Sequence, residues 1–319
     1  MNLILLEEFG PPDVLRLREA PDPAPRRGEV LIEVAFASVT FVETQFRAGH
    51  GPFQVELPMV PGNGVGGVVT AVGDGVDEAL LGRTVISTTG GGGGYAEAVA
   101  VDADLPIPVP DGVSLDEAVA LLADGRTANM LLDLTPPKTG ERVLILAAGG
   151  GVGSLLVQLA AASGATVVAA AAGKRELLRA LGANVIADYR VADWPATVRA
   201  AVGEVDLLLD GVGGELAAAA FGLVSPGGRM VSYGMASGDW ANIPEQNAGQ
   251  RGVRLLQPGP LAVHDAKRLS ARALRQAAER RLRPVIGQRF PLADAAGAHR
   301  AIESRLTVGK TLLTTRSAG

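Results

Sequence analysis

The sequence contains no cysteine, little lysine and few aromatic residues. The absence of cysteine excludes disulfides, a thiolate zinc site and a cysteine nucleophile. Only four of the 29 basic residues are lysine, and aromatic residues make up 4% of the chain. A net charge of −5 argues against a surface that binds nucleic acids or anionic membranes. The preference for arginine, with much alanine and glycine, suggests a GC-rich bacterial genome.

No stretch of the sequence is typical of a membrane anchor or a signal peptide. Residues 155–173 are mostly apolar, but Gln158 and Gly164 interrupt them, so a helix, a turn and a strand are expected there. The N-terminus lacks a basic start and reaches Glu7 and Glu8 too early for a signal peptide. We therefore expect a cytoplasmic protein. With 319 residues, 47% of them hydrophobic, the chain can form about two domains.

The most informative stretch is an apolar run, residues 143–148, that ends in glycines and continues as a helical pattern. This order predicts a buried parallel strand, a tight turn and a helix N-terminus. Glycines let the backbone approach a ligand, and the helix start offers N–H donors, so a pyrophosphate would fit there. Gly149, Gly151 and Ser154 follow the G-x-G-x-x-G spacing, with serine in the last place. Alone, this motif would also suit a glycine turn in any α/β protein.

The residues around this motif predict an α/β fold. From about residue 121 to 265, strand and helix patterns alternate, which predicts a doubly wound parallel sheet with a ligand crevice at the carboxyl ends of its strands. Besides the first strand, we expect strands at 166–171, 185–187, 205–210 and 228–234.

The two ends of the chain predict a second domain. Residues 1–120 show short strands with glycine corners, which is typical of a partly open β-barrel. Within it, the glycine run 90–94 is expected to be a flexible surface loop, because no helix start follows it. Residues 266–319 contain helical patterns and a closing strand at 309–314, which we expect to return to the first domain.

The end of the second predicted strand indicates which nicotinamide cofactor is bound. A sheet that selects NAD usually carries an acid there, which binds the ribose 2′-hydroxyl. Here three alanines lead into Gly173, Lys174 and Arg175, and no acid is present. Because cations at this point would pair with a 2′-phosphate, the sequence favours NADPH over NADH. The alternative is an ordinary solvated pair of cations at a helix start.

Several motifs, in the right order, resemble the medium-chain dehydrogenase/reductase superfamily, in its zinc-free quinone oxidoreductase branch. Residues 61–69 are similar to P-G-x-E-x-x-G-x-V, residues 125–128 to G-x-T-A, and residues 147–154 to A-A-x-G-G-V-G-S. The remaining matches lie at 188–190, 206–214, 225–229, 298–305 and 309–310.

The resemblance covers nearly the whole chain and implies its domain organisation. A GroES-like catalytic domain would comprise residues 1–120 and be completed by 266–319. A Rossmann NADPH-binding domain would comprise residues 121–265. Homodimers are common in this family, so the resemblance also implies a homodimer.

The resemblance implies a cofactor site drawn from the matching segments. Thr127 would lie near the nicotinamide, and Tyr189 near the adenosine phosphate unless it is a core tyrosine. The expected cofactor-binding residues are Thr127, Gly150, Gly151, Val152, Gly173, Lys174, Arg175, Tyr189, Val212, Gly234 and Lys310.

The chain departs from the family pattern where metal and substrate would bind. The usual G-H-E motif reads G-N-G at 62–64, so no metal is expected, because a catalytic zinc needs three ligands. The segment that commonly reads N-F-x-D-x-Y-x-R-x-G falls at 40–49. Thr40, Gln45 and Arg47 are expected to line the substrate site and bind a developing oxyanion. The alternative for Gln45 and Arg47 is a surface position.

Three functions are compatible with these residues. The resemblance implies hydride transfer from NADPH to a small-molecule quinone or an activated C=C bond (an enone). An enoyl-thioester reductase of a biosynthetic pathway would share the scaffold, because the pocket and not the fold decides the substrate. The altered pocket positions also leave open a non-catalytic NADPH-binding protein.

Overall fold

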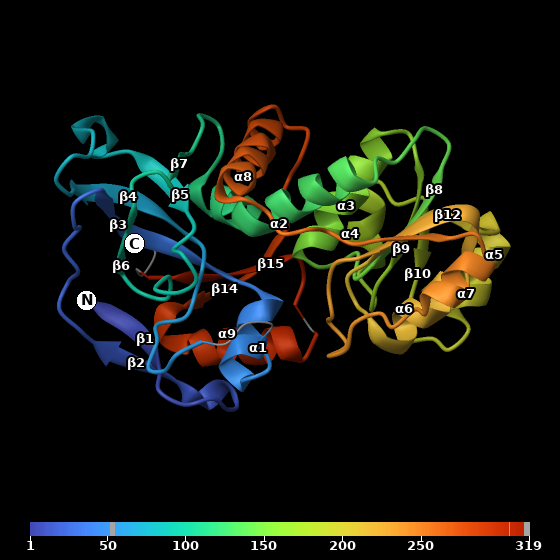
Figure 1. Ribbon diagram of the computed structural model, residues 1–319, viewed down its shortest axis with the longest axis horizontal. Coiled ribbons are helices and arrows are strands. Elements are labelled where there is room, and N and C mark those ends of the chain that lie inside the picture. Colours follow the sequence, from blue (N-terminus) through green and yellow to red (C-terminus); the bar gives the residue numbers. More distant parts are fainter. Residues whose placement is uncertain (52–54, 306, 316–319) are drawn as a thin grey trace. The chain divides into compact units, whose positions relative to one another are not determined.

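The computed structural model describes residues 1–51, 55–305 and 307–315 (Figure 1). The described chain divides into two compact units. Unit 1 comprises Met1–Arg126 and the segment from Ala266 onward, and unit 2 comprises Thr127–Asp265. The boundary falls inside helix α2 (Leu115–Leu134), slightly later than residue 121. None of the described helices has the length and apolarity needed to cross a membrane.

Unit 2, all of whose residues are described, is built on a six-stranded parallel sheet in the order β10-β9-β8-β11-β12-β13. Counted along the chain, the order is 3-2-1-4-5-6 and reverses between β8 and β11, as in a Rossmann fold. The predicted doubly wound sheet is therefore confirmed. Its strands are β8 (Arg142–Leu146), β9 (Thr166–Ala170), β10 (Val185–Ala187), β11 (Val205–Asp210), β12 (Val224–Ser232) and β13 (Arg254–Leu256).

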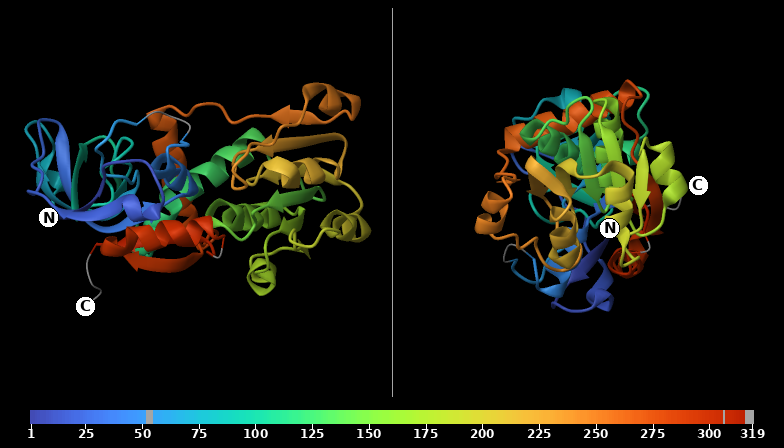
Figure 2. Two further views of the ribbon diagram at one scale, coloured as in Figure 1. Left: turned by 90° about the horizontal axis from the view of Figure 1, so that it is seen from below. Right: turned by 90° about the vertical axis from the view of Figure 1, so that its right-hand side faces the viewer.

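Helices bury both faces of this sheet (Figure 2). On one face, Leu144, Val168 and Leu208 share a core with Trp194 and Phe221. The alternate strand residues are buried too, and α3 contacts β8 and β9. Burial on both faces explains why these strands are continuous apolar runs. The helices are α3 (Gly151–Ala162), α4 (Arg175–Ala180), α5 (Trp194–Val202), α6 (Gly214–Phe221) and α7 (Glu245–Gln250).

The turn after β8 is compact. Ala147 adopts a left-handed conformation with φ of 52°, and Gly150 is the N-cap of α3. A Cβ at Gly153 would lie 2.2 Å from the carbonyl oxygen of Ala147 and 2.8 Å from Cα of Ala148. Glycine at 153 therefore lets the first turn of α3 approach the strand end closely.

Unit 1 is organised around the long strand β3 (Glu29–Val39), which pairs antiparallel with β4, β6 and β15. Strand β15 comes from the end of the chain, so the closing strand returns to the sheet of the first segment. The other strands are β1 (Asn2–Leu6), β2 (Leu15–Glu19), β4 (Val65–Val72), β5 (Thr84–Ser87), β6 (Ala98–Asp102), β7 (Ile107–Pro108), β14 (Ile286–Pro291) and β15 (Lys310–Thr314). The helices are α1 (Phe41–Ala48) and α9 (Ala295–Glu303), besides the parts of α2 and of α8 (Val263–Ala278) that belong to this unit.

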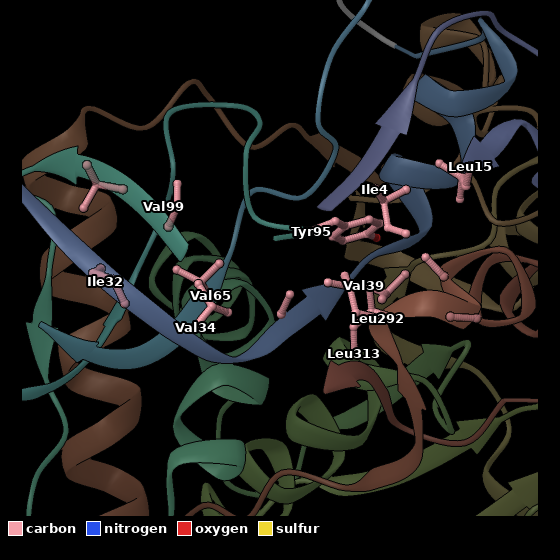
Figure 3. Packing of buried hydrophobic residues seen from close by; sticks show 14 of the residues in the cluster. Ile4, Leu15, Ile32, Val34, Val39, Val65, Tyr95, Val99, Leu292 and Leu313 are labelled. Carbon is pink, nitrogen blue, oxygen red and sulfur yellow. The ribbon is translucent and has the colours of Figure 1, made fainter. Parts of the chain in front are cut away.

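The core of unit 1 is apolar apart from a short chain of polar groups. Ile4 and Ile32 are fully buried in it, and Tyr95 lies among them (Figure 3). The hydroxyl of Tyr95 lies 3.0 Å from Nε2 of His299 and 3.2 Å from the Glu43 carboxylate. Burial, with a contribution from Arg47, lowers the pKa of His299 to about 3, so this imidazole is neutral near neutral pH.

Replacing Gly153 by alanine will destabilise unit 2. The new methyl group would overlap the backbone of the preceding turn, and such overpacking costs about 1–3 kcal/mol of the free energy of unfolding. Urea unfolding of the full chain measures this. The matched control is Gly249→Ala inside α7, where no atom lies within 4 Å of the added Cβ. That variant should gain about 0.5–1 kcal/mol. Equal stability of the two variants would contradict the packing argument.

The stability contribution of His299 will depend on pH. The pKa of His299 is about 3 in the folded chain and 6.5 for a free histidine side chain, so folding favours the neutral form. This contribution is fully present above pH 6.5 and is lost as the pH falls toward 3. Between these values, the stability advantage of the wild type over His299→Gln should shrink by up to about 1.4 kcal/mol per pH unit.

The control for this experiment is His264→Gln, because His264 is exposed. Its free energy of unfolding should follow that of the wild type across the same range. A constant difference between the wild type and His299→Gln would show that His299 does not titrate differently on folding. If His299→Gln does not fold, an NMR titration of the wild-type His299 imidazole replaces it, and this imidazole should stay neutral until the pH approaches its pKa of about 3.

Candidate functional site

Most of the predicted cofactor residues gather at one edge of unit 2. Strands β8 to β12 are parallel, so their carboxyl ends lie at the same edge of the sheet. Each of these ends is followed by at least one predicted residue. They are Gly150, Gly151 and Val152 after β8, Gly173, Lys174 and Arg175 after β9, Tyr189 after β10, Val212 after β11 and Gly234 after β12.

The start of α3 is suited to hold an anion. No side chain caps this helix in the fully described unit 2, because its N-cap is Gly150. The N–H groups of the first turn and the positive end of the helix dipole therefore stay available for an anionic group. A Cβ at Gly150 would lie 3.3 Å from the carbonyl oxygen of Ala147, so glycine keeps this turn uncrowded.

Lys174 brings a positive charge to the same turn. This residue has a left-handed backbone with φ of 65° and precedes α4. A Cβ at Gly149 would lie 2.5 Å from Cδ of Lys174 and 3.5 Å from its Nζ. The lysine side chain thus crosses from the end of β9 to the turn after β8. Burial lowers the pKa of Lys174, as expected for an ammonium group that has lost part of its hydration.

Arg190 is a further cation beside this point, and no role was predicted for it from the sequence. Its Nη2 would lie 3.4 Å from a Cβ at Gly173. Its Nε donates to Asp188 at 3.0 Å, and Arg190 is the main reason that the pKa of Asp188 falls to about 2. The position could have been found from sequence, because it follows the strand expected beside the second one. Arg175 lies exposed in the first turn of α4.

Asp210 fixes the turns that carry Val212 and Gly234. Its buried carboxylate accepts the N–H groups of Val212 and Gly213 at 2.8 and 2.9 Å, and the hydroxyl of Ser232 at 2.9 Å. Burial raises the pKa of this carboxyl. A Cβ at Gly234 would lie 2.7 Å from the carbonyl oxygen of Gly211, so the two turns touch through their backbones.

Two other predicted residues have mixed environments. Tyr189 is half-buried and packs against the core of unit 2, so part of its ring is core, as the alternative interpretation had it. Thr127 lies within α2 and is the first residue of unit 2.

In unit 1, helix α1 carries the predicted catalytic residues. Thr40 is its N-cap and forms a capping box with Glu43, and the Thr40 hydroxyl oxygen is buried. Gln45 is half-buried, and its Nε2 donates to the hydroxyl of Thr44 at 3.2 Å.

Arg47 points into unit 1 and is not a surface residue. It is 2% exposed, forms an ion pair with Glu303 of α9 and donates to the carbonyl oxygen of Thr44 at 3.2 Å. Burial lowers the pKa of Arg47. Its Nε and Nη1 are buried with no hydrogen-bond partner in the described part of the chain. These contacts join α1 to α9.

Lys310 is also engaged inside unit 1. Its ammonium is buried and lies 3.2 Å from Oδ1 of Asp124 in α2. This ion pair stabilises the contact between β15 and α2. The cofactor contact expected for Lys310 stays a prediction.

The glycine run 90–94 is bound to the segment 60–63. The N–H of Gly91 donates to Oδ1 of Asn63 at 2.9 Å, that of Gly93 to the carbonyl of Val60 at 2.7 Å, and that of Gly94 to the carbonyl of Gly62 at 2.9 Å. These backbone groups find partners in a neighbouring segment, which anchors the run, and the expected flexibility of the loop stays a prediction. Within the described ranges, no group of three or more His, Asp or Glu residues could hold a metal ion.

Comparisons with known proteins cover both units. An alcohol dehydrogenase GroES-like domain matches residues 26–111, and the zinc-binding dehydrogenase family matches residues 181–313. A probable quinone oxidoreductase of Schizosaccharomyces pombe is 33% identical over 98% of this chain and 96% of its own length. A 2-haloacrylate reductase of a Burkholderia species is 30% identical over 97% of each chain.

A solved structure leads to the same family. A mycobacterial protein in complex with NADPH is 34% identical, with a TM-score of 0.90 over 98% of this chain and 99% of that one. The similarity runs through the GroES-like segment and the Rossmann sheet alike. The chain therefore belongs to the medium-chain dehydrogenase/reductase superfamily, in its quinone oxidoreductase branch.

Proposed function

We propose that this chain is a zinc-independent, NADPH-dependent oxidoreductase that transfers a hydride to a quinone or to an activated C=C bond such as that of an enone. The observation that carries the proposal is the position of Lys174. Its side chain reaches the glycine turn at the N-terminus of α3, in the sheet edge where a Rossmann fold binds its dinucleotide. The similarity to proteins named for quinone and 2-haloacrylate supports an electrophilic small-molecule acceptor.

The residues of unit 2 fit the parts of NADPH. The N–H groups at the start of α3 would bind the pyrophosphate, with Gly150 keeping the turn uncrowded. Lys174, Arg175 and Arg190 would bind the 2′-phosphate, since the end of β9 has no acid to accept a ribose hydroxyl.

The remaining cofactor residues would complete the binding site. Tyr189 would lie beside the adenosine phosphate and Thr127 beside the nicotinamide, while Val212, Gly234 and Lys310 would line the remainder. When bound, the cofactor supplies the hydride, and the protein positions it against the acceptor.

The residues of α1 would bind the substrate. Hydride addition leaves negative charge on the acceptor oxygen, which needs hydrogen-bond donors when no metal is present. Thr40 and Gln45 would supply such donors. Arg47, held by Glu303, would position α1 and act through the helix. From the resemblance we also infer a homodimer.

An enoyl-thioester reductase is the second enzymatic candidate, and a non-catalytic NADPH-binding protein is the third. The enoyl-thioester reductase would reduce enoyl thioesters much faster than simple quinones or enones. The non-catalytic protein would bind NADPH and would not oxidise it with any acceptor.

NADPH oxidation will test the proposal directly. The purified chain is mixed with 1,4-benzoquinone, 9,10-phenanthrenequinone or a simple enone, and the dihydronicotinamide absorbance is followed. We expect turnover with NADPH, little turnover with NADH and no effect of EDTA. Turnover that EDTA abolishes would contradict the zinc-independent mechanism. Tight NADPH binding without turnover, also with an enoyl thioester, would favour the non-catalytic protein.

The variant Lys174→Met will weaken the binding of NADPH but not that of NADH. A hydrogen bond to a charged group contributes about 1.5–3 kcal/mol, so the KM for NADPH should rise by about 10- to 100-fold. The KM for NADH should change little, because NADH has no 2′-phosphate. Arg179→Met, in the last turn of the same helix, is the matched control and should leave both values unchanged. An equal rise for both cofactors would show that Lys174 does not recognise the 2′-phosphate.

A further inference from the structure

The side-chain amide of Asn63 uses its oxygen in hydrogen bonds, whereas its nitrogen is not engaged by the described residues. Its Oδ1 accepts the N–H groups of Gly91 at 2.9 Å and Thr89 at 3.2 Å. Because both partners are N–H donors, the amide atom that faces them must be the oxygen. The amide is planar, so its Nδ2 is directed away from the glycine run. The residue is exposed, and Nδ2 has no hydrogen-bond partner among the residues that the structure describes.

The backbone of Asn63 is held beside that of Thr40. The Glu43 carboxylate accepts the N–H of Asn63 through Oε1 at 2.9 Å and the N–H of Thr40 through Oε2 at 2.7 Å. Glu43 is 7% exposed and is itself bound by the Tyr95 hydroxyl. A single buried carboxylate therefore fixes the relative position of the proposed substrate residue Thr40 and of Asn63.

We propose that Nδ2 of Asn63 is a substrate-binding group that donates a hydrogen bond to the carbonyl oxygen of the acceptor. This inference rests on the proposed function. As the hydride bonds to the electrophilic carbon, the electron pair of the conjugated π system moves onto this oxygen, and NADPH becomes NADP⁺. Asn63 stabilises the resulting oxyanion and transfers no proton. The oxyanion takes its proton from water.

The structural arrangement favours this role over loop anchoring alone. Anchoring the glycine run uses only the oxygen of Asn63, which an aspartate would supply equally well. The prepositioned N–H donor is the additional feature, and a donor whose orientation is fixed before the reaction needs no reorganisation as charge develops. Glu43 is a positioning residue in this arrangement, because it acts through the backbone of Asn63.

Two variants of Asn63 test the donor. Asn63→Asp keeps an oxygen for Gly91 and Thr89 but replaces the donor with a negative oxygen, whereas Asn63→Ala removes the donor without adding charge. The matched control is Asn184→Asp in unit 2. Asn184 is also exposed, and its Oδ1 also accepts a backbone N–H, that of Val167 at 2.8 Å. Melting curves establish that each variant is folded.

The probe is 4-nitrophenol, whose anion imitates the oxyanion and whose absorbance reports its ionisation. It is titrated into the chain saturated with NADP⁺, and NADPH turnover with an enone is measured in parallel. The wild type and Asn184→Asp should bind the phenolate and lower the pKa of the probe. Both Asn63 variants should bind the phenolate at least about 10-fold more weakly, and kcat should fall by about 10²- to 10³-fold with NADPH affinity unchanged.

Each outcome is informative about the donor. Phenolate binding as tight in Asn63→Ala as in the wild type would overturn the inference, as would an equal loss in Asn184→Asp. Failure of the proposed function has a different signature. If the wild type binds phenolate through Asn63 but none of the acceptors supports NADPH oxidation, the proposed reaction is contradicted and the donor role is supported.

Discussion

The arrangement of unit 1 depends on the hydrogen bonds that the buried carboxylate of Glu43 accepts. Burial disfavours its charged form and raises its pKa, and its hydrogen bonds to Thr40, Asn63 and Tyr95 offset that cost. Through Tyr95, the same network reaches His299 of α9. The start of α1, the segment before β4 and helix α9 are thereby held together.

The parallel sheet of unit 2 imposes a constraint of another kind. Parallel strands in register bring their carboxyl ends to one edge, so residues distant in the sequence gather there whatever their side chains. The chain uses this edge to collect cations and free N–H groups, with Lys174 extending across Gly149. Asp210 then orders the next turns by accepting backbone N–H groups. An edge with this chemistry is suited to a phosphorylated dinucleotide.

A common fold can accommodate different chemistry because a few side chains decide how the substrate is bound. The family motif that supplies metal-binding residues reads G-N-G at 62–64. In this chain Oδ1 of Asn63 accepts backbone N–H groups of Thr89 and Gly91, and Nδ2 is the donor that we propose for the substrate oxygen. Under our proposal the scaffold stays the same while an asparagine amide polarises the substrate oxygen, and for this reason fold alone does not establish substrate.

The sequence by itself determined the Rossmann sheet, because strands buried on both faces must be apolar runs and because the glycine turn follows directly. The absence of an acidic residue after β9 could also be recognised from the sequence, since it depends only on the residue type at the end of one strand. Only the tertiary structure decided where the charged side chains find their partners. Arg47 pairs with Glu303, Lys310 with Asp124, and the glycine run binds Asn63. Periodicity and turn chemistry depend on neighbours along the chain, whereas these pairs join residues up to 256 positions apart. Local sequence carries no signal for such pairs until the fold brings them together.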